Sequence, residues 1–145
     1  MYLLLLIQRY GAWRGGLLYF KLNILKTSAL KLPELQKPVQ LRRNVQDVHA
    51  FAQVFVHREY DFNWLEDLRR IVDGGANVGF ASLYFKAAFP EAQIHAVEPH
   101  PHNAEAFRKK RARWPSDDQN DPQRDPQSFV TVTTITKSTD WGQNE

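Results

Sequence analysis

The sequence predicts an α/β fold in which part of a parallel sheet is flanked by helices, and three observations point to it. Short apolar strands are expected at 71–72 and 93–97, and each is followed directly by an acid. A glycine-rich turn occupies 74–79 between them. Apolar residues then follow a helical pattern over 80–89. This order is typical of a βαβ unit, whose two strands are parallel and end at the same edge of the sheet.

The two acids at that edge, Asp73 and Glu98, indicate which ligand the turn would accept. Gly74, Ala76 and Gly79 nearly match the dinucleotide-binding fingerprint, in which glycines let a pyrophosphate approach a helix N-terminus. Asp73 would repel a pyrophosphate but attract an ammonium group. Glu98 follows Gly79 at nearly the separation, ~20 residues, that is typical of an acid accepting hydrogen bonds from ribose hydroxyls. An adenosyl amino acid therefore fits this pair better than NAD does.

The turn also carries a family resemblance in the pattern Asp73-x-Gly75-x-Asn77-x-Gly79. This pattern resembles the FkbM family of S-adenosylmethionine-dependent methyltransferases, within the class I Rossmann-like group. Asn77 suits the central position because asparagine tolerates a left-handed backbone. The resemblance extends to Leu41-Arg42, Asp47 to Phe55, Glu59-Tyr60, and Glu98-Pro99 to Asn103.

The resemblance implies a partial Rossmann-like sheet, S-adenosyl-L-methionine as cofactor, and O-methylation of a small-molecule, sugar or lipid-linked acceptor that has a hydroxyl group. It implies cofactor contacts at Asp73, Gly75, Ala76, Asn77, Gly79 and Glu98. The catalytic residue stays unknown, since no general base can be nominated. Cysteine is absent, which speaks against a metal site and is compatible with the cytoplasmic location that we expect.

Two other classes of function remain open. One is a nicotinamide- or nucleotide-binding oxidoreductase domain, which Asp73 and Ala76 disfavour. The other is a non-catalytic interaction module built around a basic N-terminal helix. Nucleic-acid binding is not expected, because the basic run at 108–113 has no interleaved aromatic residues that could stack on bases.

The chain divides into three expected segments: a basic helical arm over 1–37, the N-terminal part of a class I methyltransferase domain over 38–114, and a polar tail over 115–145. Residues 1–43 hold eight Lys and Arg against one acid, Glu34. Such a charge suits an anionic partner, so peripheral membrane contact stays open, although packing of the arm on the domain is favoured. Leu3 to Ile7 is far shorter than the ~18–20 apolar residues that span a bilayer.

Local signals predict the elements around the central unit. Gly15-Gly16 should interrupt the N-terminal helix, and Pro38 to Arg43 should form a short strand. Asp47 is the expected N-cap of a helix whose apolar face includes Phe51 and Phe55.

The C-terminal segment does not look like part of the domain. Residues 115–127 contain no apolar residue except proline and read as linker or disorder, whereas Phe129 to Ile135 alternates as an isolated strand does. Since the family pattern fades after about residue 113, the chain is expected to be a truncated or frame-shifted product. Its methyltransferase activity on its own is expected to be weak or absent.

Overall fold

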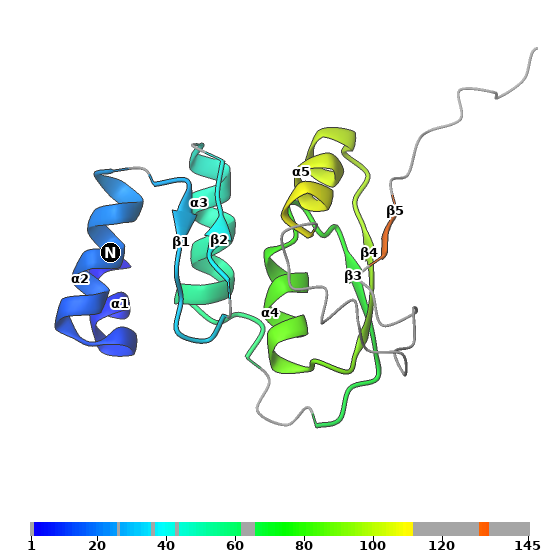
Figure 1. Cartoon of the computed structure of the whole chain (residues 1–145), viewed down its shortest axis with the longest axis horizontal. Coiled ribbons are helices and arrows are strands. Elements are labelled where there is room, and N and C mark those ends of the chain that lie inside the picture. Colours follow the sequence, from blue (N-terminus) through cyan, green and yellow to red (C-terminus); the bar gives the residue numbers. More distant parts are fainter. Residues whose placement is uncertain are drawn as a thin grey trace, which may run out of the picture.

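The computed structural model describes residues 2–25, 27–35, 37–42, 44–61, 66–111 and 131–133. Its elements in chain order are α1 (Tyr2–Tyr10), α2 (Ala12–Asn23), β1 (Ala29–Leu30), β2 (Val39–Gln40), α3 (Val45–Phe51), the π-helix η1 (Ala52–Val56), β3 (Arg70–Gly74), α4 (Phe80–Ala88), β4 (Gln93–Val97), α5 (Pro101–Arg111) and β5 (Thr131–Thr133). Figure 1 shows α4 and α5 on the side of the parallel sheet that faces α3, with α1 and α2 at the opposite end of the molecule.

The N-terminal arm is a pair of helices that turn back on each other. The turn is at Gly11, whose φ of 81° favours glycine. The prediction of an interruption at Gly15-Gly16 is wrong, because α2 runs through both residues. Gly15 serves helix packing instead: a Cβ there would lie 2.4 Å from the carbonyl oxygen of Leu6. Leu6 is fully buried, and α1 in turn contacts η1.

A small antiparallel sheet and α3 form the middle of the molecule. The strand expected over Pro38 to Arg43 is confirmed over Val39–Gln40, where β2 pairs with β1. The N-cap of α3 is Asn44, whose Oδ1 accepts a hydrogen bond from the backbone N–H of Asp47 at 2.7 Å. The prediction that Asp47 is the cap is therefore wrong. Asp47 lies one turn inside the helix, where its buried carboxylate accepts other donors described below.

The apolar face predicted for α3 packs on α4 through aromatic rings. Phe51 and Phe55 are both buried, and each ring meets Phe80 edge to face, with centroids 6.0 and 6.4 Å apart. Phe80 opens α4, so this cluster fixes the start of that helix against η1 and α3.

The predicted βαβ unit is confirmed. β3 and β4 pair in parallel from Arg70 opposite Gln93 to Gly74 opposite Val97, and α4 connects them. The helix ends at Ala88, two residues before Pro90, as expected of a residue that cannot continue a helix. Both strands therefore end at the same edge of the sheet.

The third strand of this sheet comes from the segment expected to stand apart from the domain. β5 pairs in parallel with β4, with Val132 opposite Ala96. The strand predicted from the alternation in 129–135 is confirmed over Thr131–Thr133. Its place in the sheet differs from the expectation that the tail over 115–145 is separate from the domain. The physical reason is that β4 carries hydrogen-bonding groups on both of its edges, and β5 satisfies those on the edge away from β3. The linker expected at 115–127 lies outside the described residues.

Candidate functional site

The turn after β3 is held against the end of β4 by backbone hydrogen bonds. The N–H groups of Gly75 and Ala76 both donate to the carbonyl oxygen of Val97, at 2.8 and 3.0 Å. Three residues of the turn have left-handed φ angles: 76° at Gly75, 51° at Asn77 and 84° at Gly79. Asn77 therefore has the left-handed backbone that the sequence predicts it to tolerate. This folding holds the ends of β3 and β4, which carry Asp73 and Glu98, at one edge of the sheet.

Glu98 is buried and organises the turn. Its Oε2 accepts the backbone N–H of Asn77 at 2.7 Å, and its Oε1 accepts that of His100 at 2.9 Å. One carboxylate thus links the glycine-rich turn to the segment that leads into α5. A carboxylate has about four acceptor positions, so two remain for other donors.

Asp73 has a different environment. It is half-buried, and its Oδ2 accepts a hydrogen bond from the hydroxyl of Ser82 at 2.5 Å. Its Oδ1 has no hydrogen bond to any other residue in the described part of the chain. The carboxylate is therefore oriented through one oxygen and keeps the other for a donor.

The remaining predicted residues divide by what surrounds them. Gly75 is exposed, and a Cβ built there would have no heavy atom within 4 Å, so the space beside it is open. Ala76 is buried; its N–H donates to Val97 and its carbonyl oxygen accepts the N–H of Gly79, so it closes the turn from inside. Gly79 lies under the ring of Phe107, where a Cβ would be 2.3 Å from the ring carbons.

Sequence reasoning missed Ser82 and Phe107 as supports of this site. Ser82 left a signal: it is a hydroxyl on the buried face of α4, among Phe80, Ala81 and Phe85. A buried hydroxyl requires a partner, and Asp73 is the acid that the preceding strand brings near. No sequence signal points to Phe107, because its contact with Gly79 is made between two different helices and has no local pattern.

A second cluster of charges joins α5 to α3 on the side of the helices away from the sheet. The carboxylate of Asp47 accepts the backbone N–H of Arg42 at 2.8 Å and its guanidinium at 2.7 and 3.0 Å. The same guanidinium donates to the side-chain oxygen of Asn103 at 3.1 Å. Burial raises the pKa of Asp47, but the hydrogen bonds from Arg42 and the charge of Lys110 outweigh it and hold the pKa below its usual value.

Lys110 is a buried cation in this cluster. Its Nζ lies 3.7 Å from Asp47 Oδ2 and 3.9 Å from the centre of the Phe80 ring, and it has no hydrogen-bond partner among the described residues. Burial lowers the pKa of Lys110 to about 8, and the attraction of Asp47 opposes this shift in part.

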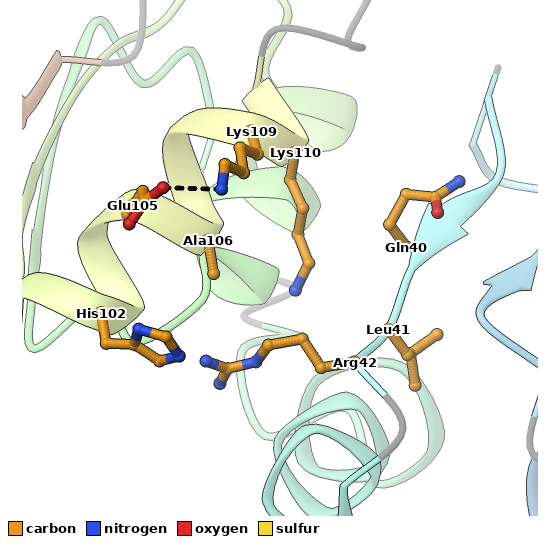
Figure 2. A pocket seen from close by; sticks show the side chains of 8 residues that line it. All are labelled: Gln40, Leu41, Arg42, His102, Glu105, Ala106, Lys109 and Lys110. Carbon is orange, nitrogen blue, oxygen red and sulfur yellow. Dashed lines mark ion pairs between the residues drawn. The ribbon is translucent and has the colours of Figure 1, made fainter.

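A cavity of about 310 Å³ opens between β2 and α5 beside this cluster (Figure 2). The residues that line it are Gln40, Leu41, Arg42, His102, Glu105, Ala106, Lys109 and Lys110. Much of its positive charge is compensated, because Arg42 is paired with Asp47 and Lys109 with Glu105 at 2.6 Å. None of the lining residues belongs to the turn after β3, and neither Asp73 nor Glu98 lines this cavity.

Comparisons with known proteins find methyltransferases. The chain is 43% identical over 51 residues to Methyltransferase sdnD of Sordaria araneosa, a match that covers 35% of this chain and 20% of that protein. It is 35% identical over 65 residues to Methyltransferase 1 of Beauveria bassiana (strain ARSEF 2860), covering 45% of this chain and 25% of that protein. The matches thus span about a fifth to a quarter of these curated relatives. No protein-family profile matches the chain, and no solved structure matches it.

Proposed function

We propose that this chain forms the cofactor-binding part of an S-adenosylmethionine-dependent methyltransferase of the class I, Rossmann-like group. The observation that carries the proposal is that Asp73 and Glu98 lie at the carboxyl ends of neighbouring parallel strands, at the edge of the sheet where the space beside Gly75 is open. Ligands of open α/β sheets bind outside the carboxyl ends of the strands. The partial similarity to two proteins named methyltransferases supports the same assignment.

The residues at this edge fit an adenosyl amino acid by their chemistry. Asp73 keeps Oδ1 for an ammonium group while Ser82 holds Oδ2. Glu98 keeps two acceptor positions, which match the two hydroxyls of a ribose. Gly75 leaves room for the ligand to approach the backbone. No phosphate-binding cation is needed, since the ligand has no phosphate group.

The reaction that we propose is O-methylation of a small molecule with a hydroxyl group, as in FkbM-type enzymes. When bound, S-adenosylmethionine supplies a methyl group attached to a sulfonium. Transfer of this methyl group to the acceptor oxygen would release S-adenosylhomocysteine and a proton, and the proton would pass to solvent water, because no general base is identified in this chain. Asp73 and Glu98 orient the cofactor for this in-line displacement and take no proton themselves, so their contribution is positional.

The first prediction tests the ligand class by calorimetric titration. Wild-type protein should bind S-adenosylhomocysteine and should bind NAD less well. Asp73→Asn should weaken S-adenosylhomocysteine binding by about 1.5–3 kcal/mol, because it removes a charge-assisted hydrogen bond to the ammonium group. Glu91→Gln removes an exposed carboxylate outside the site and is the matched control.

Two results would overturn the proposal. Tighter binding of NAD than of S-adenosylhomocysteine would indicate the oxidoreductase alternative. Binding of neither ligand by folded protein would favour the interaction module or an incomplete pocket. Transfer of a labelled methyl group to a panel of hydroxyl acceptors then tests the reaction separately from binding.

A further inference from the structure

Helix α2 is apolar on two opposite faces. Gly15, Leu18 and Leu22 are buried and form one of them. With 3.6 residues per turn, the side chains of Trp13, Leu17, Phe20 and the capping residue Ile24 fall on the other side of the helix. We refer to these four residues as the α2 stripe. Its members are 84%, 42%, 45% and 62% exposed, so the stripe faces solvent.

The packing of α1 on α2, which together form a helical hairpin, does not explain an exposed stripe of this kind. The packing needs of α2 are met by its buried face, where Gly15 lets the helix approach the backbone of α1. Figure 1 shows the hairpin at the end of the molecule opposite the parallel sheet, so the stripe lies far from the candidate cofactor site. Soluble surfaces seldom keep large apolar side chains in a contiguous row, and such a row marks an interaction surface.

The charge around the stripe limits what can cover it. Arg14 and Lys21 lie about a quarter turn from the stripe along the same flank of α2. Residues 1–33 contain five Lys and Arg and no acid. A second copy of the chain docked through the stripe would bring like charges together with no carboxylate on the hairpin to compensate them. An anionic surface is complementary to this flank.

We propose that the α2 stripe docks on an anionic lipid bilayer. In this arrangement α2 lies in the plane of the interface, its apolar stripe enters the boundary between headgroups and acyl chains, and Arg14 and Lys21 contact the headgroups. Trp13 suits that depth because indole has an apolar body and one polar N–H. No helix among the described residues is long and apolar enough to cross a membrane, so the contact is peripheral in this part of the chain. The proposal is independent of the methyltransferase assignment.

Vesicle co-sedimentation tests this docking with the full chain. The protein should bind vesicles of phosphatidylcholine with phosphatidylserine, bind pure phosphatidylcholine vesicles less, and dissociate as salt is raised. The double variant Trp13→Ser, Phe20→Ser should lower partitioning by about tenfold or more, because it removes the two large rings that would enter the bilayer. Arg14→Gln with Lys21→Gln should remove the preference for phosphatidylserine.

The control variant is Val45→Ser, which removes an exposed apolar side chain from α3, outside the hairpin. It should leave partitioning unchanged, and circular dichroism should show that every variant keeps the helix content of wild type. Equal binding of wild type and the Trp13→Ser, Phe20→Ser variant would overturn the proposal. Absence of vesicle binding, together with self-association that Trp13→Ser abolishes, would also overturn it and would make the stripe an interface between copies.

Discussion

Asp73 and Glu98 lie at the same edge of the sheet, but their surroundings give them different roles. Glu98 is buried and already accepts two backbone N–H groups, so its carboxyl group holds the turn even without a ligand. Asp73 is half-buried and accepts one hydroxyl. Substitution of Glu98 would thus disturb folding and binding together. Asp73 is the cleaner residue for a binding experiment, because fewer contacts within the protein depend on it.

At Gly79 we predict a large cost for a single added methyl group. Gly79→Ala should reduce the free energy of unfolding by about 2–4 kcal/mol, because alanine would both adopt a left-handed φ and press on the Phe107 ring. Urea denaturation measures this difference. The control is Gly16→Ala, at a helical glycine with open space around it, which should leave stability unchanged or raise it by up to ~1 kcal/mol. Similar stability of the two variants would contradict the close contact.

At the scale of elements, α5 carries a buried lysine, Lys110, that contacts Asp47 of α3 and the Phe80 ring of α4. The pKa of Lys110 is lowered by burial from 10.5 to about 8 in the folded protein. Between these pH values the unfolded chain binds the proton that the folded chain has released, so this group makes stability rise with pH. The contribution is up to about 3 kcal/mol across the window.

Lys110→Met should remove that rise. At pH 7 the variant should be at least as stable as wild type, because it replaces a buried cation that has no hydrogen bond to the described residues with an apolar chain over the Phe80 ring. Urea denaturation at several pH values from 7 to 10.5 measures the effect. Lys109→Met is the matched control, since Lys109 is largely exposed and pairs with Glu105 on its own helix. It should keep the rise; parallel pH profiles for wild type and Lys110→Met would show that Lys110 does not titrate as described.

The elements predicted correctly from the sequence are those determined by residues that are close together in the chain. The strand–turn–helix–strand unit follows from apolar runs, glycines and Pro90, and Asn77 has the left-handed backbone that its side chain allows. The misplaced features depend on contacts between distant residues. The local sequence predicts Asp47 as the N-cap of α3, but Arg42 and Lys110 pair with it inside the helix and Asn44 is the cap. Similarly, the pairing of Arg42 with Asn103, 61 residues away, has no local sequence signature.

At the scale of the whole molecule, the parallel sheet has two unequal faces. α4 and α5 cover one of them (Figure 1). Ile94 and Ala96 are buried and alternate along β4 with the exposed His95. On β3 and β4 the other face carries Val72, which is 74% exposed, and the exposed His95. Both faces of a parallel sheet are usually covered, so this exposed face is a surface on which a second sheet can pack.

We therefore expect the purified chain to self-associate through this face as its concentration rises. Val72→Lys should reduce the association, because a charge on the face disfavours stacking of two sheets. Sedimentation velocity over a range of concentrations measures it, and Val45→Lys, at an exposed valine on α3, is the control that should leave it unchanged. The result also separates the two apolar surfaces of the molecule. Association that persists in Val72→Lys but disappears in Trp13→Ser would assign the contact to the α2 stripe and contradict a role for the sheet.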